Sequence, residues 1–500
     1  MTTSGYILAI DQGTTGTTAL LVDGSGRVVW QAYREITQIY PQPGWVEHDP
    51  NDIFESVIET VDELLEATEI GVRQINSIGI TNQRETTIVW ERSTGKPLFN
   101  AIVWQCRRTA TLCDALKARG LDADVVEKTG LPIDAYFPAT KIRWLLDHIP
   151  DGQQRAENGE LAFGTVDSWL MWQLTNGTLH TTDVTNASRS MLYNIDTLEW
   201  DADLLSALDI PAAILPAVQP SSSVFGYTGG NFFGGQAIPI AGVAGDQHAA
   251  LFGQACFDPG MAKNTYGTGS FILINSGAER VRSQHGLLSI IAWGIGDSVT
   301  YGLEGSIFST GATVQWLRDG LQFIEESSDV EALAASVEDN GGVYLVPAFT
   351  GLGAPHWDMY ARGTMLGITR GTERGHIARA ALESTAYQTR DAMDAMKRDT
   401  GLDIPLLRVD GGATANELMM QFQADILGIP IERHATAETT ALGAAYLAGL
   451  ATDFWQDTTE IAQNWESDKR FEPTMSAERR DRLYAEWQRA VGRAKAWERA

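Results

Sequence analysis

One turn pattern occurs twice in this chain, about half a chain length apart. Residues 6–10 predict a short apolar strand, residues 11–18 read Asp-Gln-Gly-Thr-Thr-Gly-Thr-Thr, and residues 19–22 predict the next strand. A related pattern returns around Gly267-Thr268-Gly269, again between apolar strands. Thr14 and Thr268 are 268 − 14 = 254 positions apart in a chain of 500 residues. The spacing suggests two halves of related architecture.

Both turns have the composition of a phosphate-binding site. Glycine lets the backbone approach a ligand closely, and successive amide N–H groups in such a turn form a concave site for an anion. Threonine hydroxyls add neutral donors, and a carboxylate at a strand end, such as Asp11, can hold a metal ion through water. Either turn alone could be an ordinary hairpin. Two of them could hold a triphosphate between two domains.

A third glycine-containing turn follows the predicted strand at residues 406–409. It reads Asp-Gly-Gly-Ala-Thr-Ala-Asn from Asp410 to Asn416 and opens a predicted helix. Paired glycines allow a flat group to lie on the backbone, and Asn416 can both cap the helix and bind a ligand. By itself this is an ordinary strand-to-helix turn, so its significance lies in accompanying the other two.

Helical periodicity marks several further segments. Asp49-Pro50 is a typical helix start, followed by apolar residues at helical spacing up to Leu65. Later helices are predicted at residues 376–396, 416–427, 440–450 and about 477–497.

An acidic residue follows the small-residue strand that ends in Ala244-Gly245. Phosphoryl transfer to a hydroxyl needs a group that accepts the proton, and Asp246 suits this role. Gln247, the next residue, could bind a substrate hydroxyl. An Asp246 that only caps the following helix is an equally good interpretation of the sequence.

Arg84 and Glu85 are expected in a hairpin turn at residues 82–86. Adjacent residues on a strand point to opposite faces, so the turn would have to bring the two side chains together. Together they offer the mixed donors and acceptors that a small polyol needs. The alternative is a solvated ion pair, which has little energetic value. Apolar pocket walls could come from Trp104, Tyr136 and Phe271, although most of the 15 tryptophans must lie in the core.

Composition restricts the class of protein. A length of 500 residues predicts two or three domains, and 44% apolar against 20% charged residues excludes a mainly disordered chain. The net charge of −27 argues against nucleic acid or an anionic membrane as the main partner. Only eight residues are lysine. An acidic, lysine-poor surface favours adaptation to concentrated salt, where the Debye length falls to about 3 Å at 1 M; an ordinary acidic enzyme is the alternative.

Cellular location follows from three further observations. Cys106, Cys113 and Cys256 are too few and too scattered for a disulfide framework or a zinc cluster, so we interpret them as small apolar residues. The N-terminus lacks a secretory signal, and there is no run of about 18 apolar residues that could span a membrane. We therefore expect a cytoplasmic protein.

With these motifs in place, the chain resembles the glycerol kinases of the FGGY carbohydrate-kinase family, which share the fold of actin and the Hsp70 ATPase. The resemblance runs from Tyr6 to the C-terminal helix. Two signatures of the wider family stand at residues 136–148 and 363–383. Narrower matches to glycerol kinases are found at residues 81–86, 245–247, 264–269 and 347–355.

The resemblance implies an α/β fold of two actin-like, ribonuclease H-like domains, at residues 1–248 and 249–500, each a mixed sheet flanked by helices. The active site would lie in the cleft between them. The implied reaction is the ATP-dependent phosphorylation of glycerol to sn-glycerol 3-phosphate with Mg²⁺, by a cytoplasmic homodimer or homotetramer. Two alternatives remain open: a kinase for another small polyol or ketose, and an actin-like or chaperone ATPase without sugar chemistry.

The resemblance also implies roles for single residues. Asp246 would be the general base, and both Asp246 and Asp11 would lie near Mg²⁺. The glycerol site would consist of Arg84, Glu85, Trp104, Tyr136, Asp246, Gln247 and Phe271. The nucleotide site would consist of Thr14, Thr15, Gly16, Thr268, Gly311, Gln315, Gly412 and Asn416.

Two departures from the family pattern have consequences. Thr18 stands where family members usually carry an arginine next to the terminal phosphate, so another group or Mg²⁺ must supply that charge, or turnover is lower. The loop at residues 231–237 lacks the lysine or arginine found in members that fructose 1,6-bisphosphate inhibits. We expect no inhibition by that compound.

Overall fold

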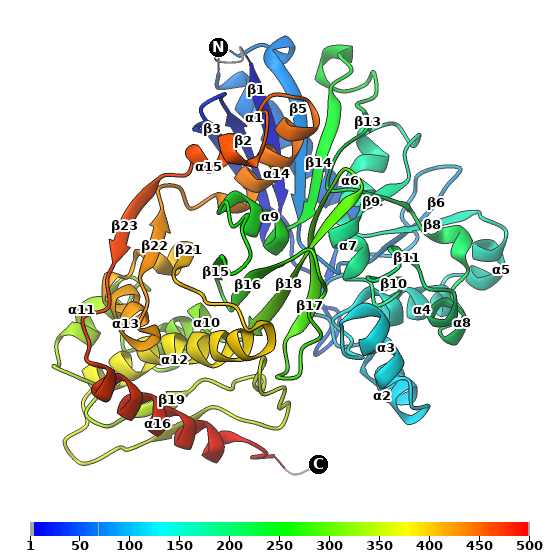
Figure 1. Cartoon of the computed structure of the whole chain (residues 1–500). Helices are drawn as coiled ribbons and strands as arrows, with labels where there is room; N and C mark the ends of the chain where they lie inside the picture. Colours follow the sequence, from blue (N-terminus) through cyan, green and yellow to red (C-terminus); the bar gives the residue numbers. More distant parts are fainter. Residues whose placement is uncertain (1–4, 69, 499–500) are drawn as a thin grey trace.

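A sheet of 13 strands runs through the molecule in the computed structural model, which describes residues 5–68 and 70–498 (Figure 1). In spatial order its strands are β23 (Ser467–Phe471), β22 (Ile431–His434), β21 (Leu407–Asp410), β15 (Ala262–Tyr266), β16 (Ser270–Gly277), β18 (Ser298–Ile307), β17 (Leu288–Ile295), β13 (Ser222–Tyr227), β14 (Pro239–Gly245), β5 (Ile75–Asn82), β1 (Tyr6–Gln12), β2 (Gly16–Val22) and β3 (Val28–Glu35).

The sheet repeats one arrangement of strands in its two halves. In the first half, β3, β2 and β1 are antiparallel neighbours, and β5 and β14 follow in parallel. In the second half, β18, β16 and β15 are antiparallel neighbours, and β21 and β22 follow in parallel. The halves meet between β13 and β17 through the residue pair Ser222 and Ile295. This topology confirms the two related halves that the repeated turn suggested.

Helices cover both halves of the sheet. They are α1 (Pro50–Glu66), α2 (Ala110–Ala118), α3 (Asp122–Thr129), α4 (Pro138–His148), α5 (Gly152–Glu157), α6 (Val166–Leu174), α7 (Val184–Ser188), α8 (Ala202–Ala207), α9 (Asp246–Gly253), α10 (Gly311–Gln315), α11 (Asp329–Ala335), α12 (Arg374–Thr400), α13 (Glu417–Leu427), α14 (Thr439–Ala451), α15 (Thr458–Gln463) and α16 (Ala477–Ala494). None of the helices within the described residues is long and apolar enough to cross a membrane.

Short two-stranded sheets complete the fold. They pair β4 (Glu47–His48) with β7 (Ala101–Ile102), β6 (Ile88–Glu91) with β8 (Leu161–Gly164), β9 (Thr181–Asp183) with β12 (Ala217–Gln219), β10 (Tyr193–Asn194) with β11 (Glu199–Trp200), and β19 (Tyr344–Val346) with β20 (Thr364–Leu366). The three cysteines are buried and free of disulfides, as expected for small apolar residues.

Helices α9 and α14 cross at the centre of the molecule with their backbones almost touching (Figure 1). A Cβ atom on Gly443 would lie 1.8 Å from the carbonyl oxygen of Ala249, and one on Gly253 would lie 2.0 Å from that of Thr439. Only glycine permits this approach, because real Cβ atoms do not come so close to backbone oxygens. The crossing fixes α9, and α9 begins with Asp246.

The start and the buried face of helix α1 follow from local sequence signals. The side chain of Asp49 accepts a hydrogen bond from the backbone N–H of Asn51, and Pro50 occupies the first turn. Ile53, Val57, Val61 and Leu64 are buried along one face, as the helical spacing predicts. This helix therefore begins where the sequence places it.

The predicted hairpin around residues 82–86 is wrong. β5 belongs to the large sheet, whereas β6 pairs with β8, where Val89 lies opposite Phe163. The partner strand is about 70 residues away, so local pattern could not identify it. Arg84 and Glu85 are 2% and 1% exposed, and Glu85 has a φ of 61°. The solvated-turn alternative is therefore also wrong.

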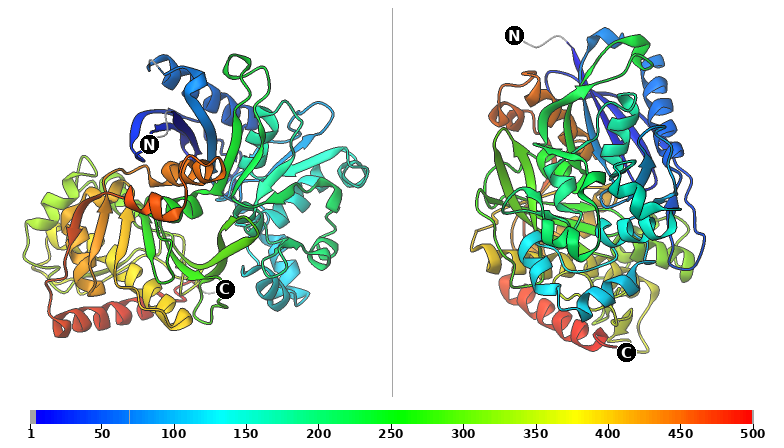
Figure 2. Two further views of the ribbon diagram at one scale, coloured as in Figure 1. Left: turned by 45° about the horizontal axis from the view of Figure 1, so that its top comes forward. Right: turned by 90° about the vertical axis from the view of Figure 1, so that its right-hand side faces the viewer.

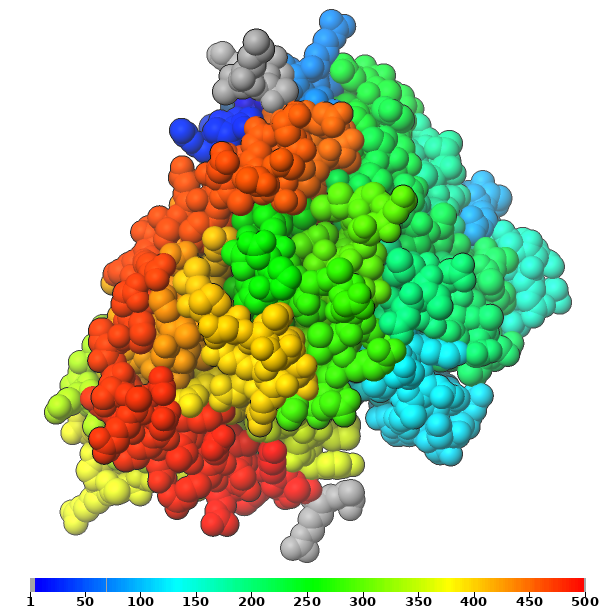
Figure 3. All heavy atoms as spheres, in the orientation of Figure 1, coloured from blue at the N-terminus to red at the C-terminus, as the bar shows by residue number. Residues whose placement is uncertain are grey.

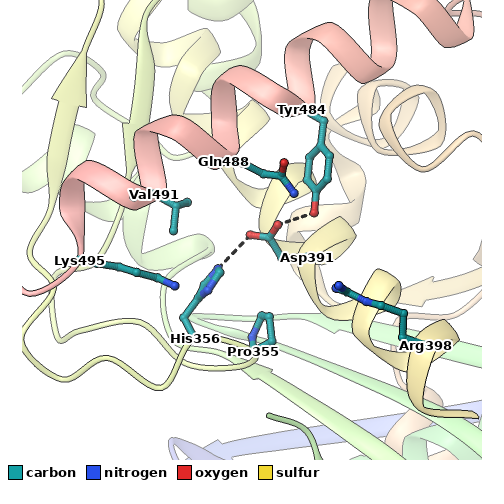
Figure 4. Close-up of a pocket in the computed structure, with 9 residues that line it drawn as sticks. Pro355, His356, Asp391, Arg398, Tyr484, Gln488, Val491 and Lys495 are labelled. Carbon is teal, nitrogen blue, oxygen red and sulfur yellow. Dashed lines mark hydrogen bonds and ion pairs between the residues drawn. The ribbon is translucent and has the colours of Figure 1, made fainter. Parts of the chain in front are cut away.

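The C-terminal helix α16 packs near α12, at the opposite end of the molecule from the first strands and α1 (Figures 2 and 3). Asp391 of α12 accepts hydrogen bonds from the hydroxyl of Tyr484 at 2.6 Å and from the indole N–H of Trp487 at 2.8 Å. His356 Nε2 lies 3.3 Å from the same carboxylate, and a cavity of about 240 Å³ opens beside this group (Figure 4). The buried carboxylate anchors α16.

Candidate active site

Asp11 and Asp246 lie at the same edge of the central sheet, near the carboxyl ends of β1 and β14. In the parallel pair of β1 and β5, Asp11 lies opposite Thr81. In the parallel pair of β14 and β5, Gly245 lies opposite Asn82. Since parallel strands end at one edge of a sheet, where α/β proteins bind ligands, the two carboxylates are placed two strands apart at that edge.

The turn between β1 and β2 is tight. The N–H of Gly13 donates to the carbonyl of Gly16 at 2.9 Å. A Cβ atom on Gly16 would lie 2.4 Å from the carbonyl oxygen of Arg34, so this position requires glycine. The indole Nε1–H of Trp104 donates to the hydroxyl of Thr14 at 2.8 Å. A predicted glycerol residue thus contacts a predicted phosphate residue directly.

A series of hydrogen-bonded polar side chains contacts this turn. Gln38 Nε2 donates to the carbonyl of Thr14 at 2.8 Å, and His48 Nε2 lies 2.9 Å from Gln38 Oε1. Gln83 Nε2 donates to Gln12 Oε1 at 3.0 Å. Burial lowers the pKa of His48 from 6.5 to about 4, so the imidazole ring is neutral at physiological pH.

Asp246 is the first residue of α9, and its carboxylate has two neighbours on one oxygen. Arg84 Nε lies 2.9 Å from Asp246 Oδ1, and the backbone N–H of Gln247 donates to the same oxygen at 2.7 Å. The Asp246 side chain is 29% exposed, which leaves it open to a ligand. A Cβ atom on Gly245 would lie 2.6 Å from Arg84 Cγ, so glycine makes room for the arginine.

Arg84 belongs to a buried cluster of two arginines and two glutamates, which we call the charged cluster (Arg84, Glu85, Arg189 and Glu304). Glu304 Oε2 lies 2.5 Å from Arg84 Nη1, and Glu304 Oε1 lies 3.2 Å from Arg189 Nη2. Arg189 Nε lies 2.6 Å from Glu85 Oε1. All four side chains are at most 2% exposed. Opposite charges therefore balance inside the protein.

Aromatic rings border the charged cluster. The rings of Trp104 and Tyr136 meet edge to face with centroids 5.7 Å apart. The guanidinium carbon of Arg84 lies 5.6 Å from the ring centroid of Phe271, and that of Arg189 lies 5.6 Å from the ring of Tyr136. The structure thus brings together, through direct contacts, Arg84, Glu85, Trp104, Tyr136, Asp246, Gln247 and Phe271.

The second glycine turn packs against the start of α10. The N–H of Gly267 donates to the carbonyl of Gly269 at 2.8 Å, and the N–H of Gly311 donates to the carbonyl of Gly267 at 3.1 Å. Thr268 therefore neighbours Gly311, and Gln315 ends the same short helix. These three predicted nucleotide residues form one group.

The third glycine turn lies beside the second. β15 and β21 are parallel neighbours, with Thr265 opposite Asp410. Gly411 has a φ of 90°, and a Cβ atom there would lie 2.4 Å from the carbonyl oxygen of Tyr266. Gly412 has open space where a side chain would be, and Asn416 Oδ1 accepts from the N–H of Met419 as the cap of α13. Thr14 and Thr15 lie in the turn between β1 and β2, and Gly16 begins β2, so all three belong to the other half of the molecule.

Known proteins share this arrangement over nearly the whole chain. Residues 6–253 match the N-terminal domain of the FGGY family of carbohydrate kinases, and residues 262–452 match its C-terminal domain. The chain belongs to the FGGY family of carbohydrate kinases.

Relatives within the FGGY family point to one branch. The chain is 59% identical to the glycerol kinase of Carboxydothermus hydrogenoformans and 60% identical to that of Symbiobacterium thermophilum, and each match covers 99% of both chains. The solved structure of Plasmodium falciparum glycerol kinase with ADP has a TM-score of 0.92 at 39% identity, covering 98% of both chains. Xylulose kinase from Lactobacillus acidophilus shares the fold, with a TM-score of 0.86 at 24% identity and coverage of 98% and 97%. The expected fold class is confirmed.

Lys141 provides a structural explanation for part of the FGGY signature at residues 136–148. This buried lysine donates to the carbonyl of Tyr136 at 2.8 Å and to the carbonyl of Glu85 at 3.1 Å. It thereby fastens α4 to the segment that carries Arg84. Burial lowers the pKa of Lys141 from 10.5 to about 7.

Sequence reasoning missed Arg189, Glu304 and Lys263. Lys263 Nζ donates to Gln247 Oε1 at 2.5 Å and to Thr265 Oγ1 at 2.8 Å. Glu304 lies inside β18, a strand of mostly apolar or small residues, and a lone charge in such a strand was a usable signal. Lys263 lies in β15, which has further polar residues, so its charge does not stand out in the sequence. Arg189 follows a short helix in a polar segment, so no local sequence pattern distinguishes it.

The carboxylates fit a hard divalent cation. Burial raises the pKa of Asp11 well above its ordinary value, and the negative charges of Asp246 and Glu438 raise it further. A cation would relieve this repulsion, and carboxylate oxygens suit Mg²⁺. Within the described ranges, no three His, Cys, Asp or Glu side chains form a metal site by themselves.

Both departures from the FGGY pattern can be located in the structure. Thr18 lies in β2 directly opposite Asp11, so the missing arginine concerns the surroundings of that carboxylate. The loop at residues 231–237 contains the short helix η3 (Phe233–Gly235), and the Phe232 ring packs edge-on against Phe54 at 5.7 Å.

Proposed function

We propose that this chain transfers the terminal phosphoryl group of ATP to glycerol, giving sn-glycerol 3-phosphate and ADP, with Asp246 as the general base. The contact of Asp246 with Arg84, beside the charged cluster and its aromatic rings, carries the proposal. Relatives that are 58–60% identical over nearly the full chain are named glycerol kinase, which supports glycerol as the acceptor. The ADP in the Plasmodium falciparum structure supports an adenine nucleotide as the donor.

Asp246 has one oxygen available for the reacting hydroxyl. Its two contacts within the described residues, with Arg84 and with the N–H of Gln247, are both made by Oδ1. In our proposal Oδ2 accepts the proton as the glycerol oxygen bonds to the γ-phosphorus. The bond between that phosphorus and the β,γ-bridging oxygen breaks, and ADP leaves with that oxygen. Proton acceptance by a positioned carboxylate contributes about 10²–10⁴-fold to such reactions.

The phosphates would lie against the turn at Thr14, Thr15 and Gly16 on one side and at Thr268 on the other. Gly311, Gln315, Gly412 and Asn416 would then hold the nucleoside in a cleft between residues 1–248 and 249–500. When bound, Mg²⁺ near Asp11 and Asp246 neutralises phosphate charge. With threonine at position 18, we propose that the phosphate site depends mainly on backbone N–H groups, hydroxyls and this ion.

The remaining family expectations are also proposals. They are a cytoplasmic homodimer or homotetramer and the absence of inhibition by fructose 1,6-bisphosphate, because the loop at residues 231–237 offers no lysine or arginine to its phosphates.

A coupled assay for ADP tests the function. Purified protein with MgATP is given glycerol, D-xylulose, gluconate or no acceptor. We expect glycerol to accelerate ADP formation at least about 100-fold over every other condition, because a site built from hydrogen-bonding groups strongly rejects a poorly matched acceptor. Preference for xylulose or gluconate would favour another sugar kinase. ADP formation independent of any acceptor would favour an ATPase.

A further inference from the structure

A carboxylate of the C-terminal FGGY domain enters the candidate glycerol site of the N-terminal domain. Glu304 lies on β18, within the residues matched to the C-terminal domain, whereas Arg84 and Arg189 lie within those matched to the N-terminal domain. Glu304 contacts both arginines, at 2.5 Å and 3.2 Å, and is 0% exposed. The charged cluster therefore joins the two domains immediately beside Asp246.

Contacts with Glu304 and Asp246 determine which donors of Arg84 remain free. A guanidinium group has five N–H donors. Glu304 accepts from Nη1 at 2.5 Å and from Nη2 at 3.4 Å, and Asp246 lies 2.9 Å from Nε. Two of the five donors are thus used by Glu304, and Asp246 forms an ion pair beside Nε. One N–H on each terminal nitrogen remains for hydroxyl groups of a substrate.

Glu304 also limits how Arg84 can meet Asp246. Arginine and a carboxylate prefer a bidentate pair with two parallel hydrogen bonds. In the structure Asp246 pairs with Nε alone, while the end-on contact with Glu304, through one N–H of each terminal nitrogen, fixes the orientation of the guanidinium. Without Glu304 the guanidinium could rotate into a bidentate pair with Asp246. That pair would occupy Oδ2, the oxygen proposed to accept the proton.

The surroundings keep Glu304 charged. Burial alone would raise the pKa of Glu304, but Arg189 and Arg84 outweigh it and hold the pKa below its ordinary value. Ser306 Oγ donates a further hydrogen bond to Glu304 Oε1 at 3.0 Å. Two arginines and two glutamates then sum to no net charge. Removing one member would leave a buried charge without a partner, which is costly.

We propose that Glu304 is a positioning residue for phosphoryl transfer. It holds the Arg84 guanidinium in one orientation, so that a free N–H donor faces the polyol and Asp246 Oδ2 stays free. Glu304 acts through Arg84 and does not touch the substrate itself. This inference rests on the proposed function, since it concerns recognition of the acceptor hydroxyls.

A substitution of Glu304 should change how well the protein distinguishes acceptors that differ in their hydroxyl groups. Propane-1,2-diol has the same three-carbon chain as glycerol but lacks one terminal hydroxyl. A correctly held Arg84 should discriminate strongly against the diol, because it leaves a buried donor unpaired. If Glu304 no longer holds Arg84, the preference for glycerol over the diol should decrease. The ratio of kcat/KM for glycerol to kcat/KM for the diol therefore reports on Arg84 orientation.

The test compares wild-type protein with E304Q on both acceptors. We expect kcat/KM for glycerol to fall about 100-fold and the glycerol-to-diol ratio to fall at least about 10-fold, in line with the loss of a charge-assisted contact. The Kd for ADP, measured by titration calorimetry, should stay within about twofold, because the nucleotide residues lie elsewhere. An equal fall on both acceptors, with the ratio unchanged, would overturn the proposal.

A matched control separates positioning from general damage. Glu383 is a buried carboxylate bonded to Arg379 at 2.9 Å and to Asn340 at 2.8 Å, and it lies outside the candidate site. E383Q should keep the ratio. If E304Q does not fold, E304D retains the charge but is one methylene too short to reach both arginines, and its ratio should also fall about 10-fold. A folded E304D with the wild-type ratio would contradict the proposal. Wild-type protein inactive on glycerol would instead refute the proposed function.

Discussion

At the scale of single residues, the site depends on side chains that each serve two partners. Trp104 shows this most simply: its ring packs against Tyr136, and its indole N–H donates to Thr14 Oγ1 at 2.8 Å. Trp104 therefore links the proposed acceptor site to the proposed phosphate turn. A change at this residue should affect both substrates.

We predict that W104F lowers kcat/KM about 5-fold and raises KM for ATP, because one hydrogen bond of about 1 kcal/mol is lost while most of the ring stays. Trp200 provides a matched control, since its indole N–H donates to the carbonyl of Pro216 at 3.0 Å, outside the site. W200F should lose a similar hydrogen bond without a kinetic effect. Steady-state kinetics on both variants decides: identical parameters for the two would contradict the link.

Residues near one another in sequence could be predicted well. The turn motifs, Asp246 after its strand, and the pair Arg84 and Glu85 were all recognisable from local pattern and resemblance. The contacts of Arg189 with Glu85 and of Glu304 with Arg84 could not be predicted, because they join residues 104 and 220 positions apart. Pairing of that range depends on tertiary packing. Local pattern also predicted a hairpin after β5, where β6 instead pairs with distant β8.

At the scale of elements, the crossing of α9 and α14 holds Asp246 in place. A Cβ atom on Gly443 would lie 1.8 Å from a backbone oxygen of α9, which cannot move aside cheaply. The sequence predicted a helix of small residues at 440–450 but not what it packs against. Its small residues are explained by the closeness of α9.

We predict that G443A lowers the free energy of unfolding by about 1–3 kcal/mol, because overpacking forces the helices apart. Since α9 carries Asp246, kcat should fall as well. Gly492 of α16 is the control, because a Cβ atom there meets nothing within 4 Å. G492A should be neutral or slightly stabilising, by up to about 1 kcal/mol. Urea unfolding of both variants measures this, and a G443A protein as stable and active as G492A would refute the tight crossing.

At the scale of the whole molecule, the buried His48 and the half-buried His180 make stability depend on pH. Burial lowers the pKa of both His48 and His180 from 6.5 to about 4. Between those values the unfolded chain binds protons that the folded chain does not, so stability falls as pH falls from 6.5 to 4. Each residue contributes on the order of 2–3 kcal/mol over the full window.

Urea unfolding of wild-type protein and H180Q at pH 7 and pH 5 isolates the contribution of His180 from those of the other titrating groups. H180Q, which lies outside the proposed site, should show a smaller loss than wild type between the two pH values. Equal losses for the two proteins would show that His180 is not held neutral by the fold.

The net charge of −27 also belongs to the whole molecule. The proposed phosphate site uses backbone N–H groups, hydroxyls and a metal ion, so the acid surplus need not oppose ATP binding there. If the surplus is an adaptation to salt, activity in 1 M KCl should remain within about twofold of that in 0.1 M KCl, because self-repulsion is screened. Loss of activity with KCl would refute salt adaptation and leave the proposed reaction standing.

The central claim is that Asp246 accepts the proton when glycerol is phosphorylated, and ³¹P NMR of wild-type and D246N protein with MgATP and glycerol tests it most directly. Wild type should convert glycerol and ATP into a phosphate monoester and ADP in equal amounts. D246N should still bind ADP but form product about 10³-fold more slowly, because the amide cannot accept the proton. A D246N protein with near wild-type rate, or wild type releasing inorganic phosphate instead of the ester, would contradict the account.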